Sequence, residues 1–458
     1  MIDQSRTERY VARRSAIEVR QGRLTGLDVE ADDVAGRLRA DMARMWEVIR
    51  EEGCMPAGEL AAARLAVVRR VALIRQKVSE RAGLDMPVRE EVDFHPLVTG
   101  LNDQEVIGLR AKLGSMRWVE IKVANGRVYN HAESMCHVLG SLGEAPREVV
   151  WPEDPNNELA DPLARYQPGD WMGVSGVERL GERVLRGRRG LIREDIRGTV
   201  LERIEPSPGG DLALTIDVKL QEAVLDILAD AIESNPTSRG HGGAAVVLDI
   251  ATRQVLAMVS YPVFDANQRR RSLKEYEEFV GASPLVFRAV AGVYAPGSVC
   301  KPVALAAGLT LGVVSPEDRI ECTGYLFPGV NVWRCWTATN DPPLPGHGWV
   351  NASDSLKYSC NIYFFKLGEA IGGDRLTQWQ KKFGLGMAPG TGLIEERGGI
   401  VPTPDWLARH RQRPMRVGDG RNLAIGQGDI TVTPLQVANL AATVRSEERR
   451  VGKECRSR

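Results

Sequence analysis

The chain has 458 residues and a formal net charge of zero at pH 7, with 43% hydrophobic and 26% charged residues. That length predicts two or three domains with sizeable cores, and the balanced charge gives no electrostatic case for binding nucleic acid or a lipid surface. Seven cysteines are too few for a disulfide-stapled scaffold, and no run approaches the 18 apolar residues of a membrane span. The composition is ordinary for a globular protein.

The first 95 residues are charged and predict mainly helix. Residues 58–81 carry apolar side chains at helical spacing among Arg, Glu and Lys, which predicts a long amphipathic helix that packs in a non-catalytic domain. From residue 97 the pattern becomes mixed. Asn102 is expected to cap a helix that ends at Leu113, and residues 118–123 alternate as a strand. We expect His131 and His137 to be surface or packing residues.

The second half begins with a predicted strand over 211–217 and a helix over 218–232, after a linker at 205–210. Residues 243–250 and 254–260 predict a hairpin whose strands are apolar enough to be central in a sheet. These elements indicate a second domain that contains both strands and helices.

A break and a buried helix frame the first candidate site. Pro296 and Gly297 predict a turn, and residues 301–311 predict a buried helix. Ser298 would lie in its first turn, with Lys301 three residues later on the same face. A neutral lysine amine there can take the proton of a serine hydroxyl, and the helix N-terminus favours developing negative charge.

A second motif supports the catalytic interpretation of Ser298 and Lys301. Ser359 and Asn361 form Ser-x-Asn downstream. Ser-x-x-Lys followed by Ser-x-Asn is the acyl-serine signature of penicillin-binding proteins and serine β-lactamases. The chain resembles the class B penicillin-binding proteins from about residue 127 to 444. Residues 243–249, 288–292 and 423–428 are also similar to segments of that family. The stretches 322–325, 335–336 and 346–348 most resemble the penicillin-binding protein 2 branch.

The resemblance implies a multi-domain α/β fold. An N-terminal α+β pedestal, or dimerisation, domain would comprise a helix-rich segment (1–95) and a second part (96–205). A serine-transpeptidase domain (206–445) would follow, with a central antiparallel sheet flanked by helices and incomplete at its C-terminus. The charged tail (446–458) has no apolar face and is expected to be disordered or an artefact.

The resemblance also implies a peptidoglycan D,D-transpeptidase of cell elongation that β-lactams inhibit and that needs no cofactor for catalysis. Its substrate would be the stem peptide of the lipid-linked precursor, and its partner a membrane glycosyltransferase of the elongation machinery. Ser298 would be the nucleophile, Lys301 the base, Ser359 the proton relay to the leaving amine, and Asn361 the group that orients the substrate and Lys301. The catalytic domain would lie on the outer, periplasmic face of a bacterial cytoplasmic membrane.

The chain departs from the family pattern at both ends. No Lys-Thr-Gly follows Gln436, and Gly390-Thr-Gly392 lies too early and follows Pro389. The family's N-terminal anchor is not found. We therefore expect a truncated chain that is weakly active or inactive. Two alternatives are a non-catalytic scaffold, which the missing triplet favours, and a β-lactam-hydrolysing or -sensing protein, which the long pedestal opposes.

Three cysteines and a histidine share one loop-rich stretch: Cys322, Cys335, His347 and Cys360. Four such ligands suffice for a closed tetrahedral zinc site, although the tight Cys-x-x-Cys pairs of zinc fingers are missing. Cys360 lies between Ser359 and Asn361, so a structural zinc would tie the loop to the candidate site. A disulfide in an oxidising compartment and unlinked buried thiols are the alternatives.

Overall fold

The computed structural model describes residues 11–20, 43–53, 57–84, 94–101, 103–116, 119–150, 161–167, 170–195, 199–267, 283–339 and 344–445. The chain divides into two compact units, one of residues 1–130 with 144–171 and one of residues 131–143 with 172–458. The domain boundaries at 95, 205 and 445 stay predictions. The predicted tail lies outside the described residues.

The first unit contains a three-stranded antiparallel sheet in the order β2–β1–β3. Its strands are β1 (Val11–Arg20), β2 (Phe94–Leu101) and β3 (Val119–Arg127). The helices are residues 43–51, α2 (Ala57–Ala82), α3 (Asp103–Leu113) and α5 (Arg147–Val150), with a 3-10 turn at Pro162–Ala164. The predicted long helix, the helix ending at Leu113 and the strand after it are confirmed, whereas Asn102 and Trp118 lie outside the described residues.

The strand β1 corrects the expectation that the first 95 residues are mainly helical. It pairs with both β2 and β3, which lie far from it in the sequence. Strand formation depends on such tertiary partners more than helix formation does. The core of this unit is apolar and comprises Met45, Val48, Ile49, Val98, Leu101, Val106, Leu109, Leu113 and Met116.

The second unit begins with short elements. They are α4 (Cys136–Leu139), β4 (Ser141–Glu144), β5 (Trp171–Ser175), α6 (Gly176–Leu180), α7 (Glu182–Leu185), β6 (Leu191–Glu194) and β7 (Val200–Ile204). β4 pairs with β5, and β6 with β7. His131 is exposed beside Glu222, and His137 is buried between the rings of Phe264 and Phe287. Both histidines therefore lie as predicted.

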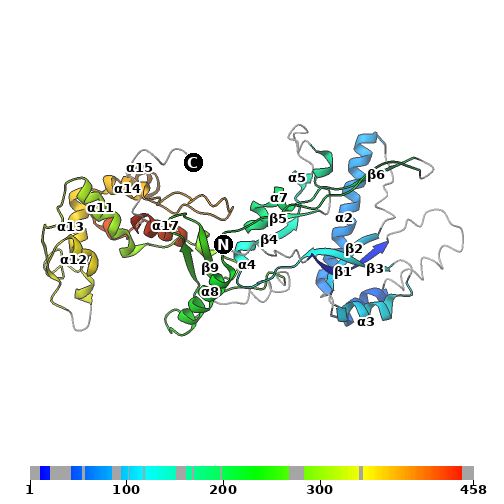
Figure 1. Ribbon diagram of the computed structural model, residues 1–458, viewed down its shortest axis with the longest axis horizontal. Coiled ribbons are helices and arrows are strands. Elements are labelled where there is room, and N and C mark those ends of the chain that lie inside the picture. The colour runs from blue at the N-terminus through cyan, green and yellow to red at the C-terminus, as the bar shows by residue number, and fades with distance from the viewer. Residues whose placement is uncertain are drawn as a thin grey trace. The chain divides into compact units, whose positions relative to one another are not determined.

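The predicted hairpin is confirmed as β8 (Gly243–Leu248) and β9 (Val255–Tyr261), which pair antiparallel. The predicted helix is confirmed as α8 (Val218–Glu233). Asp217 caps its N-terminus, and the Asp217 carboxylate accepts a hydrogen bond from the N–H of Leu220. α8 and α17 (Pro434–Arg445) lie beside this hairpin (Figure 1), and α10 (Arg288–Ala291) contacts it as well.

The predicted strand over 211–217 is wrong. No ladder forms there; the Thr215 hydroxyl and the N–H of Asp217 donate to the carbonyls of Val255 and Leu256 in β9. Leu212 and Ile216 pack against the core cluster of the hairpin, but the segment does not join its ladder.

Helices form the rest of the second unit. They are α11 (Lys301–Thr310), α12 (Ala352–Lys357), α13 (Asn361–Ile371), α14 (Gly373–Lys382), α15 (Pro404–Arg411) and α16 (Val417–Ala424), with 3-10 turns at Gly297–Cys300 and Trp336–Thr339. Strands β10 (Ile320–Cys322) and β11 (Gly348–Val350) pair antiparallel. α13 is central, because its buried residues Ile362, Tyr363, Phe364, Phe365 and Leu367 belong to the main core. No helix within the described ranges has the length and apolar content to cross a bilayer.

Two glycines allow α13 and α16 to approach closely. A Cβ on Gly368 would lie 2.4 Å from the carbonyl oxygen of Gly420, and a Cβ on Gly420 would lie 2.9 Å from that of Gly368. Any side chain at these positions would push the two helices apart. The contact therefore fixes the helix that begins at Asn361.

We expect Gly368→Ala to destabilise the second unit by about 1–3 kcal/mol, because the added methyl group overpacks a backbone contact. Denaturant titration followed by tryptophan fluorescence would measure this change. Lys366→Ala, at an exposed position on the same helix, is the matched control and should change stability by less than about 0.5 kcal/mol. Equal stabilities for the two variants would contradict the close-packing argument.

Candidate functional site

The candidate nucleophile lies in a 3-10 turn that leads directly into α11. Ser298 is exposed within Gly297–Cys300, and Lys301 is the first residue of the helix. The N–H of Gly297 donates to the carbonyl of Gly426 at 2.8 Å. Gly426 has φ +68°, and a Cβ on it would lie 2.1 Å from the carbonyl oxygen of Gly297. Only glycine at position 426 can therefore pack this closely against the 3-10 turn that carries Ser298.

Lys301 is a buried cation with three partners. Its side chain is 1% exposed, and Nζ donates to the Ser359 carbonyl at 2.7 Å, to Ser359 Oγ at 2.9 Å and to Asn361 Oδ1 at 2.7 Å. The Phe364 ring lies 5.4 Å from the ammonium. An ammonium has three donors, so all of them are used. Burial lowers the pKa of Lys301 to about 8, so a substantial fraction of the amine is neutral at moderately alkaline pH.

Ser359 joins the lysine to the nucleophile. Its hydroxyl accepts from Lys301 and donates to Ser298 Oγ at 3.0 Å. The backbone of Ser359 has φ +51°, a left-handed conformation that is uncommon for a residue other than glycine. Strained residues of this kind persist where the surroundings fix them, and they cluster at active sites.

The four residues that the two motifs predicted therefore meet in one hydrogen-bonded chain. Asn361 begins α13, and its amide also donates to the carbonyl of Arg334 at 3.3 Å. The sequence predicted the residues but not the order of contacts, in which Ser359 stands between Ser298 and Lys301. Their catalytic roles remain predictions.

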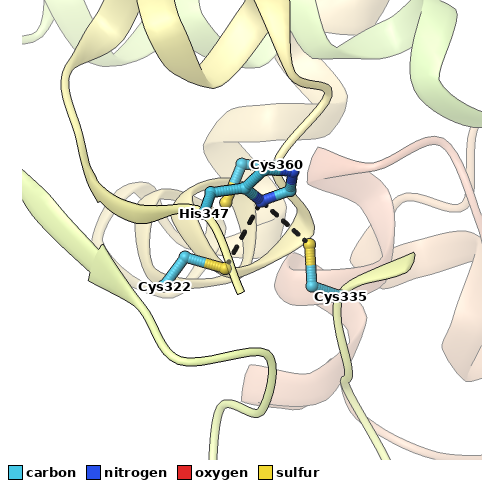
Figure 2. A group of neighbouring side chains, drawn as sticks. All are labelled: Cys322, Cys335, His347 and Cys360. Atoms are coloured by element: carbon cyan, nitrogen blue, oxygen red, sulfur yellow. Dashed lines mark hydrogen bonds between the residues drawn. The ribbon is translucent and has the colours of Figure 1, made fainter. Parts of the chain in front are cut away.

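The four predicted metal ligands also come together. Figure 2 shows the side chains of Cys322, Cys335, His347 and Cys360 pointing toward one centre, and their ligand atoms all lie within 4.8 Å of one another. His347 Nδ1 is 3.5 Å from the sulfur of Cys322 and 3.5 Å from that of Cys335. Cys322 ends β10, and Cys360 directly precedes α13. None of the described cysteines forms a disulfide.

The spacing of these atoms fits zinc. Tetrahedral bonds of about 2.3 Å to sulfur and about 2.0 Å to nitrogen place those two atoms about 3.5 Å apart, and two sulfurs about 3.8 Å apart. Hydrogen bonds from Cys322 and Cys360 hold the pKa of Cys335 far below its usual value, which favours the thiolate form that binds metal. A four-ligand set of this kind has no open position for catalysis.

Aromatic rings fix the histidine of the cluster. His347 stacks on Tyr358 at 5.7 Å and meets the edge of Trp336 at 5.4 Å. The Trp336 indole N–H donates to the Tyr358 carbonyl at 3.0 Å. Because Ser359 follows Tyr358, this packing connects the cluster to the candidate active site.

A cleft that the sequence analysis missed adjoins Asn361. It has a volume of about 440 Å³ and is lined by Val332, Trp333, Arg334, Trp336, Thr339, Asn361, Phe365, Asn422, Ile425 and Gln427. The sequence signal that could have revealed it is the pair of tryptophans, Trp333 and Trp336, on either side of Arg334 and Cys335. The cleft brings two tryptophans and an arginine beside the residue that holds Lys301.

Known families match most of the chain. The penicillin-binding protein transpeptidase domain matches residues 243–452, and the penicillin-binding protein dimerisation domain matches residues 47–214. The chain is 33% identical over 357 residues to the peptidoglycan D,D-transpeptidase MrdA of Escherichia coli K12, an alignment that covers 75% of this chain and 53% of that protein. It is 34% identical over 331 residues to MrdA of Haemophilus influenzae, with 70% and 48% covered. The chain thus spans about half the length of the curated relatives it matches.

Solved structures agree with these matches. Penicillin-binding protein 2 of Pseudomonas aeruginosa in complex with WCK 5153 aligns with a TM-score of 0.54 at 30% identity, covering 69% of this chain and 63% of that chain. A peptidoglycan synthase complex that coordinates polymerization and crosslinking aligns with a TM-score of 0.57 at 28% identity, covering 81% and 63%. The Helicobacter pylori complex of penicillin-binding protein 2 with MreC, at 22% identity and a TM-score of 0.66, covers 94% and 72% and shows likeness of fold.

We expect Gly426→Ala to slow the acylation of Ser298 by a fluorescent penicillin at least about tenfold, because a misplacement of about 1 Å can cost more than that. The added methyl group would collide with the backbone of Gly297 and move the nucleophile turn. Gel fluorescence over time would measure the rate. Gly428→Ala is the control. Gly428 also has a positive φ, but a Cβ there would lie 3.4 Å from Asn422, which is an ordinary van der Waals contact. Equal slowing in both variants would attribute the effect to backbone strain alone.

Proposed function

Because the chain belongs to the class B penicillin-binding proteins of the penicillin-binding protein 2 type, we propose that it is a peptidoglycan D,D-transpeptidase that acts through an acyl-serine. The observation that carries the proposal is the hydrogen-bonded chain from Ser298 Oγ through Ser359 Oγ to Lys301 Nζ. An exposed serine connected to a buried lysine of lowered pKa is what nucleophilic catalysis requires.

In the proposed acylation, Ser298 Oγ attacks the carbonyl of the penultimate D-alanine of a stem peptide. Its proton passes to neutral Lys301, and the Ser359 hydroxyl, which touches both groups, provides the path. The bond to the terminal D-alanine then breaks, and the departing amine takes a proton back from Lys301 through Ser359. The products are the acyl-serine ester and free D-alanine.

Electrostatic stabilisation would accompany the attack. The N–H of Ser298 lies in the first turn before α11 and is a candidate donor to the oxyanion. Asn361 keeps Lys301 in place through Oδ1. An amine of a second stem peptide then attacks the ester, which forms the cross-link and releases Ser298 with its proton. A β-lactam would trap Ser298, because its strained amide is attacked in the same way.

We also propose the setting in which this reaction occurs. A structural relative comes from a complex that couples polymerization to crosslinking, which supports a membrane glycosyltransferase as partner. The MrdA relatives are named peptidoglycan D,D-transpeptidases, which supports action on peptidoglycan. We propose that this chain acts on the lipid-linked precursor at the outer, periplasmic face of the cytoplasmic membrane.

We expect labelling by a fluorescent penicillin to require Ser298 and to become faster with rising pH. Only neutral Lys301 can accept the proton, and burial lowers the pKa of Lys301 to about 8. The rate constant should rise about tenfold per pH unit well below that value and level off above it. Rapid-quench labelling from pH 6 to 10 would measure the profile.

Two variants assign the profile. Ser298→Ala should abolish labelling. Asn361→Asp places a carboxylate beside the ammonium and should raise the midpoint by about one pH unit or more. No labelling of the unmodified chain would favour a non-catalytic scaffold, and rapid release of hydrolysed penicillin would favour a β-lactamase.

We propose in addition that Cys322, Cys335, His347 and Cys360 hold a structural zinc ion, for which the 3.5 Å sulfur–nitrogen separations are the support. When bound, zinc would cross-link β10, the 3-10 turn at Trp336–Thr339 and the start of α13. The ion would keep the loop that carries Ser359 in its strained conformation.

We expect elemental analysis to find about one zinc ion per chain. Removal of a residue that only orients a metal ligand lowers metal affinity about 10–100-fold, and His347→Ala, which removes a ligand itself, should lower it by more than that. The variant should also lower the melting temperature and slow acylation, although Ser298 is untouched. His241→Ala, at an exposed histidine, is the matched control. A chain purified near neutral pH without zinc would overturn this assignment.

A further inference from the structure

The cleft beside Asn361 is lined almost entirely by uncharged groups. Among its lining residues, Arg334 carries the one charged side chain, and the others are aromatic, aliphatic, amide or hydroxyl groups. A volume of about 440 Å³ falls within the roughly 300–1,000 Å³ of pockets that bind small ligands. The cleft therefore has the size and the walls of a binding site, with a single positive charge.

One wall is held rigidly in a strained conformation. Trp333 has φ +56°, which is a clear outlier for an aromatic residue. Its indole N–H donates to Asn422 Oδ1 at 3.2 Å, and the Arg421 guanidinium lies 4.5 Å from its ring. Arg421 is in turn paired with Glu369 at 2.7 Å. These contacts offset the backbone strain and preorganise the indole.

Arg334 stands on a backbone that is fixed on both sides. Its carbonyl accepts the amide of Asn361, and Cys335 and Trp333 flank it. The side chain is exposed, and within the described residues its guanidinium makes no ion pair. A guanidinium on a rigid base is well suited to a planar anion, because its fork matches a carboxylate.

The cleft is directly coupled to the catalytic residues. Asn361 contacts Lys301 through Oδ1 and Arg334 through its amide nitrogen. On the other wall, Gln427 is exposed and follows Gly426, which packs against the nucleophile turn. A ligand in the cleft would thus lie next to the residues that carry Ser298 and Lys301.

We propose that this cleft is a subsite for a carboxylate-bearing segment of a peptidoglycan stem peptide, with Arg334 as the carboxylate ligand and Trp333 and Trp336 as its walls. The inference rests on the transpeptidase function proposed above. Stem peptides carry free carboxylates along a short polar backbone. The tryptophans would cover the backbone, and the exposed amide of Gln427 would supply a further hydrogen bond.

The test is calorimetric binding of a synthetic stem tripeptide with free carboxylates to the full 458-residue chain, compared with the same tripeptide amidated at its carboxylates. We expect the acid to bind more tightly and Arg334→Gln to weaken its binding by about 10–100-fold, the range of hydrogen bonds to a charged group. Binding of the amide should not change. Arg334→Lys keeps the charge but loses the fork, so it should restore only part of the affinity.

Arg319→Gln is the matched control, because Arg319 is exposed and does not line the cleft. If the loop of Arg334→Gln unfolds, as its zinc content and melting temperature would show, Arg334→Lys decides the question. Equal binding by the unmodified chain and by Arg334→Lys, equal binding of acid and amide, or no binding of the tripeptide would each overturn the subsite.

Labelling of Ser298 by a fluorescent penicillin separates this inference from the proposed function. Serine-dependent labelling without tripeptide binding leaves the acyl-serine function intact and removes the subsite. Arg334-dependent binding without labelling supports the subsite and removes the function.

Discussion

The buried ammonium of Lys301 is the interaction on which the candidate site depends. Burying a charge is costly unless its donors are all satisfied, and here Ser359 and Asn361 provide the three acceptors. The same three bonds bring the two motifs together, although one motif leads into α11 and the other into α13. The strained backbone of Ser359 and the start of α13 are thus positioned by the need to solvate one cation inside the core.

The cysteine cluster and the cleft extend this arrangement outward. Cys360 sits between the two residues that hold Lys301, and Cys335 sits between Arg334 and Trp336, so each cysteine shares its backbone with functional neighbours. Trp336 both lines the cleft and packs against His347. A metal at the cluster would therefore determine the conformation of the nucleophile network and of the cleft wall at once.

The sequence predicted the parts that depend on local patterns. The helices at 57–82, 218–233 and 301–310 and the hairpin at 243–261 follow from periodicity and turn residues, and the four motif residues were indicated by their resemblance to the acyl-serine signature. The strand β1 and the loop at 211–217 did not, because both are decided by partners distant in sequence. The cleft could not be predicted either. It depends on the left-handed backbone of Trp333 and on the contact of its ring with Arg421, and no local sequence pattern predicts that contact.

The contact of Gly426 with Gly297 has a consequence for folding. The turn that presents Ser298 is completed by a segment that is synthesised much later than the turn itself, and such distant pairings form slowly because loop-closure entropy must be overcome first. A nascent or partly unfolded chain would contain α11 but not an ordered nucleophile. Reactivity of the serine is therefore a property of the finished second unit, and covalent labelling reports the integrity of its tertiary structure as well as its chemistry.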